Sequence, residues 1–489
     1  MQHLNTLLIA TLPETFPAQL TAAYLTRSGA HREPTAELAS VVPSLANGGI
    51  TPDGKTVVFH LRPGLRWSDG APLTARDVIF TTQRILAKDS PVGSTNGWDQ
   101  IAAVDSPRPG DVRFRMKASY GPAIHTFFSS IGGYSILPEH ALATVRDLRR
   151  ASFNDLPIGS GPFKYSEFRR GDSIVMIANP FYFRGRPKLD KIVYKFVTDD
   201  NLRVTELLTG EVDMALRVPP TQLLRLRDKA GLSVVRTPSG FTTFMEFNTR
   251  HPPLDDIRVR RALYSALDRD AILAKVYHGA GSVSDDIVTP LDPFVGAPIP
   301  ATPPDLKRAA QLLDASGWHS DATGIRHRHG RKLSIDVVTF ATDQIGAAAM
   351  ELVRAQWASI GESIASRRLN IDVFNALDGV AARGNFGSVS FGLPLESENL
   401  ADTFGCASRS NSTQPCDRGV DELLVRADHS QNPVIRTKLY LEARRRIAAA
   451  ASYIPIIHPD DIHFLRSGVT GFRPNGSTLF DDVMDLDRS

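Results

Sequence analysis

The chain of 489 residues is predicted to fold as a globular α/β protein: one observation predicts the α/β class, and two predict a globular chain without a membrane span. Segments with strand patterns and segments with helix patterns alternate along the whole sequence. Hydrophobic residues make up 42% of the chain and charged residues 22%, which is ordinary for a soluble globular protein. The longest apolar run, 447–457, contains Ser and Pro and is shorter than the roughly 18 residues of a membrane-spanning helix. The length is sufficient for two domains, each with its own core.

The first third of the chain shows signals for short strands and helices. Residues 7–11 form an apolar run that ends before Pro13, and this run predicts a first strand. Thr74 is suited to cap a helix over 75–86, because its hydroxyl can accept a hydrogen bond from a free N–H of the first turn. The other elements expected here are strands at 56–62 and 112–116 and helices at 124–131 and 140–149.

The stretch 155–214 has the clearest pattern, because turn, strand and helix signals follow one another without a gap. A turn that contains glycine and proline opens it. The helix in this stretch is expected to begin after Asn201 as its N-cap and to end at Gly210. Alternating apolar positions predict strands at 174–177, 192–197 and 212–216.

The rest of the sequence continues the alternation. Pro238-Ser239-Gly240 separates two predicted strands and is a candidate crossover between domains, whereas 282–304 is rich in proline and predicts little regular structure. The remaining predicted elements are helices at 221–230, 257–267, 268–279, 306–316, 346–360, 419–427 and 434–450, and strands at 232–236, 242–248, 333–340, 363–369, 385–391 and 454–458.

The sequence carries no recognisable catalytic, nucleotide-binding or metal-binding motif. The glycine-containing turn at 159–162 lacks the Gly-Lys-Ser/Thr of a phosphate-binding loop. No Gly-x-Ser-x-Gly sequence is present. His458 and His463, with two Asp between them, form the best local cluster of metal ligands, but a polar bend after a strand is the simpler interpretation. We therefore predict no catalytic residue, no metal and no cofactor.

The charge pattern argues against a nucleic-acid partner. The net charge is +3, and the densest basic run, Arg326 to Lys332, is short and carries no aromatic residue. A solvated hairpin loop is the expected role of this run.

The only two cysteines, Cys406 and Cys416, flank a polar loop. In an oxidising compartment a disulfide that closes this loop is the natural interpretation, and free thiols are the alternative. A zinc site would need further ligands near by, and the interval contains no His. No signal peptide is recognisable at the N-terminus. A removed signal, a late start and a protein that stays inside the cell are all open explanations.

Three stretches resemble one family. They are DGKTVVFHLRPGLRWSDGAPLTARDVIFTTQRIL (53–86), PIGSGPFKYSEFRRGDSIVMIANPFYFRGRPKLDKIVYKF (157–196) followed by LLTGEVDM, and TTFMEFNTRHPPLDDIRVRRALYSALDRDAIL (242–273). They resemble bacterial extracellular solute-binding proteins of family 5, the binding components of peptide, dipeptide, oligopeptide and nickel ABC importers. With residues 305–318 the resemblance covers most of the chain in the same order.

This resemblance implies a two-lobed periplasmic-binding-protein fold of type II (cluster C), with a ligand cleft between the lobes. Lobe I would comprise residues 1–238 with 459–489 returning to it, and lobe II residues 239–458. The chain would not be an enzyme. It would be a periplasmic monomer that captures a short peptide or related solute and delivers it to an inner-membrane ABC permease. In a single-membrane bacterium it would be anchored outside the cell.

The resemblance also indicates where the ligand would bind. Members of the peptide-binding branch of the family commonly hold the ligand's α-ammonium with an Asp in a segment like Gly-Trp-x-x-Asp-Tyr-x-x-Pro. The corresponding segment here contains Phe391, Gly392 and Leu393, and Pro394 stands where that Asp is expected. Glu396 or Glu398 would then supply the negative charge from a shifted position. Alternatively, the protein does not anchor a free amino group and prefers another solute.

Five further residues are candidate ligand contacts. Glu14 follows the predicted first strand, where the family often places an acid that contacts the ligand. Trp98 lies in a loop and would either contact the ligand or support that loop. Phe241, Thr243 and Met245 occupy alternate positions of one strand, so that they face either the ligand or the core.

Two other functions remain as alternatives. An intracellular ligand sensor could use the same fold, and a hydrolase could assemble its site from residues distant in sequence. The sequence leaves the ligand open among short peptides, glycopeptides, opine-like conjugates, metal chelates and haem.

Overall fold

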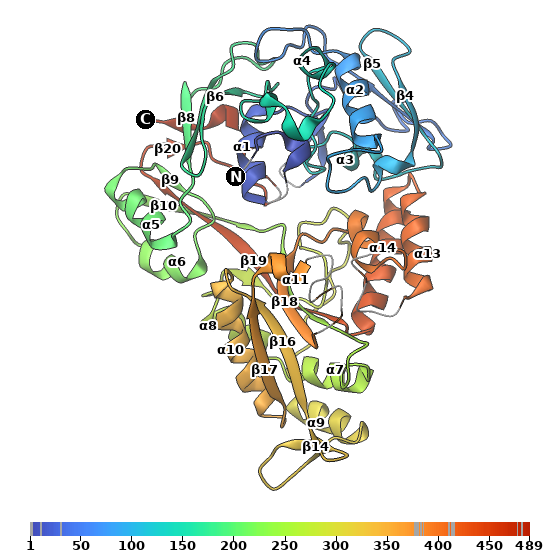
Figure 1. Ribbon diagram of the computed structural model, residues 1–489, viewed down its shortest axis with the longest axis vertical. Helices are drawn as coiled ribbons and strands as arrows, with labels where there is room; N and C mark the ends of the chain where they lie inside the picture. The colour runs from blue at the N-terminus through green and yellow to red at the C-terminus, as the bar shows by residue number, and fades with distance from the viewer. Residues whose placement is uncertain are drawn as a thin grey trace.

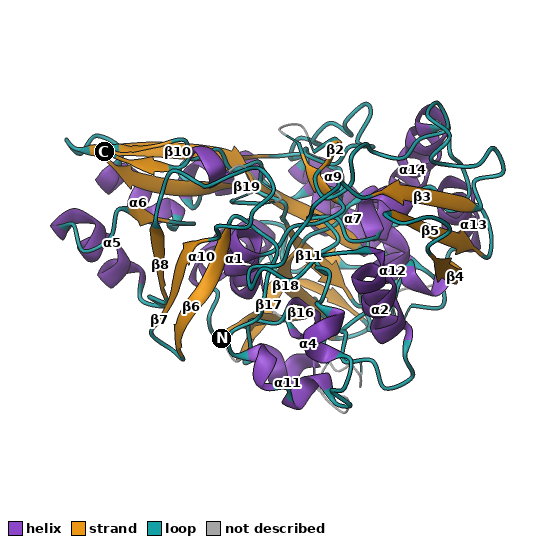
Figure 2. Cartoon of the chain, turned by 90° about the horizontal axis from the view of Figure 1, so that it is seen from above, coloured by secondary structure: helices purple, strands orange, loops and turns teal. Residues whose placement is uncertain are grey.

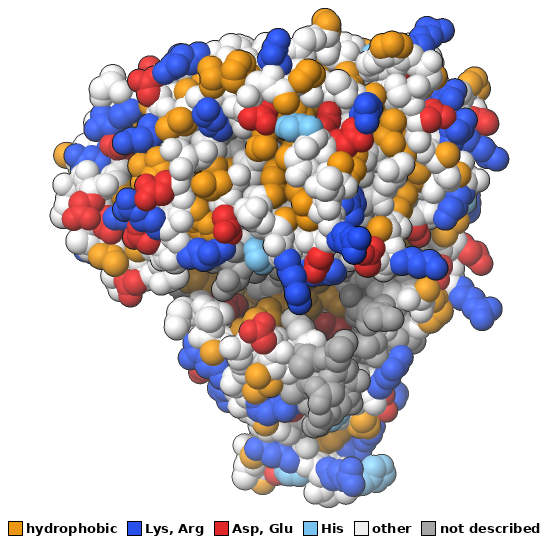
Figure 3. Space-filling model, turned by 45° about the horizontal axis from the view of Figure 1, so that its top comes forward, with side chains coloured by type: hydrophobic (Ala, Val, Ile, Leu, Met, Phe, Trp, Pro, Cys, Tyr) orange, Lys and Arg blue, Asp and Glu red, His pale blue; other side chains and the backbone are white. Residues whose placement is uncertain are grey.

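The computed structural model describes residues 3–9, 12–29, 32–375, 381, 384, 386–408, 411, 416–476, 478–480 and 483–489, without the side chains of 12–14. A broad upper part contains the elements up to β10 together with β20 and β21, and a narrower lower part contains those from β11 to α14 (Figure 1). The long strand β19, Tyr453–Arg466, runs between the two parts. The space-filling surface is hollowed where they meet (Figure 3).

The upper part contains two three-stranded antiparallel sheets, which lie on opposite sides of the molecule (Figure 2). The first consists of β3 (Thr56–His60), β5 (Asp111–Met116) and β4 (Ile101–Asp105), and the second of β6 (Phe163–Arg169), β7 (Ser173–Ala178) and β8 (Lys191–Lys195). The remaining elements are α1 (Leu12–Thr21), the hairpin of β1 (Thr26–Ser28) and β2 (Pro34–Ala36), α2 (Ala75–Leu86), α3 (Ala123–Thr126), α4 (Glu139–Leu142), α5 (Asp200–Thr209), β9 (Met214–Ala215), α6 (Pro220–Leu226), β10 (Leu232–Pro238), β20 (Val469–Thr470) and β21 (Asp487–Arg488).

Local capping signals set the bounds of two helices in this part. Thr74 caps α2 as predicted, and Asp77 completes a capping box because its carboxylate accepts from the Thr74 N–H at 2.7 Å. Helix α5 ends at Gly210 as predicted, with φ of 87°. Its N-cap is Asp199 rather than Asn201, because the Asp199 carboxylate accepts from the Leu202 N–H at 2.8 Å.

The lower part is built on a sheet that includes β19. The strand order is β10–β19–β11–β18–β16–β17, with β9 and β12 also paired to β19. The new elements are β11 (Thr242–Phe247), α7 (Ile257–Ser265), α8 (Arg269–Lys275), β12 (Gly281–Ser282), α9 (Leu306–Ala315), β13 (His319–Ser320), β14 (Arg326–Arg328), β15 (Arg331–Lys332), β16 (Ser334–Phe340), α10 (Gln344–Ala358), β17 (Ser363–Leu369), α11 (Ile371–Asn375), β18 (Ser388–Leu393), α12 (Leu400–Phe404), α13 (Arg418–Asp428) and α14 (Pro433–Ala449).

Strand β19 belongs to both parts. Its first residues, 453–457, pair with β11, and its last residues, 460–466, pair with β10. The predicted crossover lies beside it, because the Ser239 N–H donates to the Pro459 carbonyl at 2.9 Å. The hydrophobic clusters divide in the same way. The buried residues of each cluster come either from 1–238 with 459–489 or from 239–458, and the exception is Ala280.

Four sequence predictions of local structure are corrected. Residues 7–11 contain no described strand: Thr6–Leu8 is a 3-10 helix, α1 begins at Leu12, and 10–11 lie outside the described residues. The expected polar bend after 454–458 is instead a continuation of β19 to Arg466, because Asp460 and Asp461 are paired with Arg236 and Arg217. The helix expected at 124–131 is only the short helix α3. The helix expected at 140–149 is replaced by the short helix α4 and the separate 3-10 helix Leu148–Arg150.

Cys406 and Cys416 form the expected disulfide, which lies between α12 and α13. Among the described residues, Cys406, Cys416 and Asp421 are the group of possible metal ligands whose ligand atoms lie close together. The two sulfurs of this group are bonded to each other in the disulfide. None of the helices that the structure describes is long and apolar enough to cross a bilayer.

Candidate functional site

The loop that follows β18 carries both acids predicted near the ligand. Its N-terminal end is fixed by Leu395, which is buried, and by a hydrogen bond of 2.9 Å from the Glu396 N–H to the Asn399 side chain. The buried carboxylate of Asp292 accepts a hydrogen bond from the Ser397 N–H. Burial, with the nearby charge of Glu396, raises the pKa of Asp292 to about 6. The loop therefore holds Glu396 and Glu398 in defined positions.

Glu398 lies between two cationic side chains. Its Oε2 is 2.7 Å from Nδ1 of His125 on α3, and its Oε1 accepts from the guanidinium of Arg436 on α14. Its side chain is only 12% exposed. Burial alone would raise the pKa of Glu398, but the charges of His125 and Arg436 and their hydrogen bonds lower it. Burial would likewise lower the pKa of His125, yet the charge of Glu398 raises it. The two groups thus favour each other's charged form.

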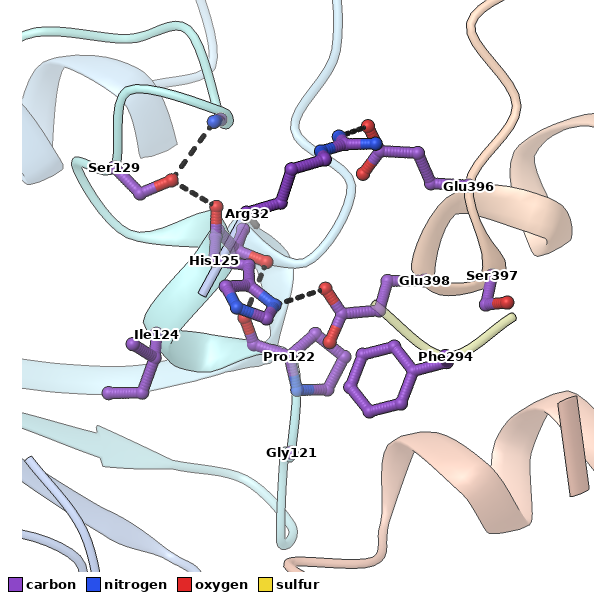
Figure 4. Close-up of polar contacts among 12 residues, drawn as sticks. Arg32, Gly121, Pro122, Ile124, His125, Ser129, Phe294, Glu396, Ser397 and Glu398 are labelled. Atoms are coloured by element: carbon purple, nitrogen blue, oxygen red, sulfur yellow. Dashed lines mark hydrogen bonds and ion pairs between the residues drawn. The ribbon is translucent and has the colours of Figure 1, made fainter. Parts of the chain in front are cut away.

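Glu396 pairs with Arg32 from the hairpin of β1 and β2. Arg32 is 1% exposed, and its Nε and Nη1 have no hydrogen-bond partner among the described residues. Its φ of 63° is in the left-handed region, which is uncommon for a residue other than glycine. Figure 4 shows Arg32 and His125 reaching from the upper part toward Glu396 and Glu398 on the lower part. Two ion pairs therefore connect the parts side by side.

Backbone contacts beside α3 support these ion pairs. The Gly121 N–H donates to the Asp428 carbonyl at 2.6 Å, and Arg436 Nη1 donates to the Gly121 carbonyl at 3.2 Å. A Cβ at position 121 would collide with the Ser430 carbonyl, so that only glycine fits this contact. The Gln431 side chain adds a hydrogen bond of 3.2 Å to Ser119. The end of α13 and the start of α14 thus lie directly against the segment before α3.

Phe294 fills the space beside Glu398. The guanidinium carbon of Arg436 lies 4.3 Å from the centre of its ring, which is a close cation–π contact. Phe294 comes from the proline-rich segment 282–304, which a buried ion pair of 2.7 Å between Asp286 and Arg444 attaches to α14. Arg444 also donates to the Val295 carbonyl at 2.6 Å. The irregular segment is therefore held by buried polar contacts.

The structure brings four other candidates together at the start of β11 and the end of β18. Thr243 pairs with Gly392 and Thr242 with Leu393 in the antiparallel register. Thr243 is half-buried and Gly392 is exposed. A Cβ at position 392 would lie 3.8 Å from the Phe241 ring. Phe241, Thr243 and Gly392 thus form one partly exposed patch at the end of the central sheet, whereas Leu393 lies on the other face of the sheet and packs against the cluster around Phe244.

The remaining candidates lie elsewhere. Met245 is fully buried in the core of the lower part, and Phe391 packs between two hydrophobic clusters of that part. Trp98 is 2% exposed and packs against Phe127, Phe128 and Tyr134, so that it supports its loop from below. Glu14 lies in α1, and its side chain is outside the described residues. A ligand contact of any of these residues stays a prediction.

Sequence reasoning missed the three cationic partners of the two acids and the aromatic ring that packs beside them. Arg32, His125, Arg436 and Phe294 occur in segments without a motif. Arg32 and Glu396 are 364 positions apart, and His125 and Glu398 are 273 positions apart. No local pattern links residues at such separations, so that only the fold reveals these pairs.

Comparison with known proteins identifies the class. The family model for bacterial extracellular solute-binding proteins, family 5, matches residues 40–392. This match covers most of the chain, and the protein belongs to that family. A probable di/tripeptide-binding protein 5 of Pseudomonas aeruginosa is 29% identical over 89% of this chain and 85% of its own length. The oligopeptide-binding protein AppA of Bacillus subtilis is 30% identical over 69% of this chain and 62% of its own length.

Solved structures show the same fold. AppA of Bacillus subtilis in complex with a nonapeptide aligns with a TM-score of 0.83 and 23% identity, covering 100% of this chain and 97% of that one. NikA of Brucella suis in complex with Fe(III)-EDTA aligns with a TM-score of 0.88 and 21% identity, covering 99% and 97% of the two chains. The chain therefore has the predicted two-lobed α/β fold of type II periplasmic binding proteins.

Proposed function

We propose that this protein is the substrate-binding component of a peptide-type ABC importer, and that it captures a short peptide or related solute between its lobes. The observation that carries this proposal is the family match over residues 40–392. Curated relatives named as di/tripeptide- and oligopeptide-binding proteins support a peptide as the ligand. As a solute-binding protein the chain has no catalytic step, and it hands the solute to a membrane permease as a monomer.

The lobes are proposed to comprise residues 1–238 with 459–489, and residues 239–458. The change of pairing partner along β19 and the division of the hydrophobic clusters support these bounds. Ligand then acts by population shift: it favours the closed form because only that form contacts it from both lobes. We propose that the ligand lies against the patch formed by Phe241, Thr243 and Gly392, since this patch is the partly exposed end of the central sheet.

We propose a location outside the cytoplasm, in the periplasm or on the cell surface. The disulfide between Cys406 and Cys416 supports an oxidising compartment. The family itself is described as extracellular.

Native mass spectrometry tests the proposed function. The protein is unfolded and refolded to remove any bound solute, incubated with a tryptic digest of casein, and passed through a desalting column. We expect mass increments that match short peptides and disappear on unfolding. A protein that retains no peptide from this mixture would contradict the peptide as ligand, and the same spectra of protein purified from its own host would then give the mass of the true solute.

A further inference from the structure

The strongest unexplained feature is the pair of acids on one loop that reaches across to the opposite lobe. Glu396 meets Arg32, and Glu398 meets His125 at 2.7 Å. Both cations belong to the upper part, and both acids to the lower part (Figure 4). The two pairs lie two residues apart on the loop, so that they form or break together when the lobes close or open.

Neither acid is left without a cation. Both carboxylate oxygens of Glu398 are already occupied, one by His125 and the other by Arg436. The Arg32 guanidinium provides the countercharge of Glu396. An incoming α-ammonium group would have to displace one of these partners, and the displaced cation would be buried without a countercharge.

The surroundings make these pairs stronger than surface ion pairs. The side chains of Arg32, Arg436, His125 and Glu398 are all nearly buried, so that water and salt screen their charges little. Arg32 holds its position with a φ of 63°, a backbone conformation that persists only where surrounding contacts impose it. The Phe294 ring packs against the Arg436 guanidinium.

We propose that Glu396 and Glu398 are closure residues, which draw the lobes together through Arg32 and His125 instead of binding the amino group of the ligand. This proposal rests on the proposed function, in that closure is the step that captures the solute. It also states what these two acids do not do: Glu396 and Glu398 do not distinguish a solute with a free α-amino group from one in which that group is blocked or absent. We call the two cross-lobe pairs the latch.

The apparent affinity of a ligand that binds only the closed form is reduced by the fraction of protein that is closed. Loss of the latch should therefore weaken all ligands by the same factor. Loss of an amine anchor should instead weaken only ligands with a free amino group. These two outcomes can be separated with trialanine and N-acetyl-trialanine as probes.

The experiment compares wild type with Glu398→Gln, His125→Gln and the double variant, and with Glu396→Gln as a second break of the latch. Glu422→Gln, at an exposed acid on α13, is the matched control. Each protein carries fluorescent labels at Lys88→Cys and Lys307→Cys, which are exposed positions on opposite lobes. Single-molecule energy transfer gives the closed fraction without ligand, titration calorimetry gives both dissociation constants, and thermal melting confirms folding.

We expect Glu398→Gln and His125→Gln each to lower the closed-to-open ratio about tenfold, with the double variant little worse than either single variant. Both dissociation constants should rise by one common factor, which is the closed fraction of wild type divided by that of the variant, both measured without ligand. Weakening confined to trialanine, or single-variant effects that add fully, would overturn the proposal. If wild type binds neither probe, the result contradicts a peptide as the ligand. The closed fraction without ligand still tests the latch in that case. The same closed fraction in wild type, Glu398→Gln and Glu396→Gln would refute the latch.

Discussion

Glu398 Oε2 lies 2.7 Å from His125 Nδ1, although the two residues are 273 positions apart in the sequence. One belongs to the loop after β18 and the other to α3, so that this contact joins the two lobes through a titratable pair. The charged groups that face His125 are Glu398, Arg436 and Glu396.

Closure should therefore depend on pH in two directions. The pKa of Glu398 is lowered from 4.5, so that its contribution to closure is present above that value and is lost as pH falls through the lowered pKa. The pKa of His125 is raised from 6.5, so that its contribution is complete below that value and is lost as pH rises through the raised pKa. We expect the closed fraction to be highest between these limits and to fall above pH 6.5. In His125→Gln the fall on the alkaline side should be absent, and its persistence there would assign it to another group.

The buried ion pair between Asp286 and Arg444 should matter for stability. Neither side chain is more than 3% exposed, and removal of one partner leaves a buried charge without a countercharge. We expect Asp286→Ala to lower the free energy of unfolding by about 3–5 kcal/mol, as for other broken buried pairs. Urea denaturation measures this change. The control is Asp228→Ala, which breaks the exposed pair with Arg227 and should change stability by less than about 1 kcal/mol. Equal effects of the two substitutions would contradict this interpretation.

Glu362 should make the protein less stable as pH rises. Burial raises its pKa to about 8, while its carboxylate accepts from the Ile335 N–H at 3.1 Å. The folded state therefore retains a proton that the unfolded state releases above pH 4.5, and stability falls between pH 4.5 and 8. We expect Glu362→Gln, which keeps the acceptor without the charge, to raise the melting temperature at pH 8 by about 2–4 °C. A smaller gain should appear at pH 5. The same shift at both pH values would exclude the ionisation of Glu362 as its cause.

The disulfide between Cys406 and Cys416 closes a short loop, with a separation of 10 positions. In the chain-entropy model, a disulfide that closes a loop of this size lowers the entropy of the unfolded chain. It thereby raises the free energy of unfolding by about 2.5 kcal/mol. The variant Cys406→Ser with Cys416→Ser should lose about this much stability in denaturant titrations without reductant. Wild type in the presence of dithiothreitol should approach the variant. A variant as stable as oxidised wild type would contradict this chain-entropy estimate.

Much of the fold could be predicted where local chemistry decides it. Thr74 and Gly210 have side-chain and backbone properties that begin and end helices in any context, and both helix ends are confirmed. The strand at 363–369 is confirmed with the same bounds. The disulfide is also confirmed, since the sequence contains only these two cysteines.

Other features depend on contacts that no local pattern encodes. Pro13 suggested the end of a strand, but it is the second residue of α1, where a missing N–H is tolerated. The polar residues of 458–463 suggested a bend, because their partners Arg217 and Arg236 lie far away in sequence. At the candidate site, the sequence located Glu396 and Glu398 but not Arg32 and His125, since those pairs exist only once the lobes meet.

Small-angle X-ray scattering of the solute-free protein, compared with the protein loaded with the peptide recovered by mass spectrometry, tests most directly whether the molecule captures solute by closing. We expect the loaded protein to have the smaller radius of gyration, near the value of about 23 Å for a compact chain of this length. The solute-free protein should be measurably larger, and Glu398→Gln larger still. Identical radii with and without the bound peptide would contradict the account.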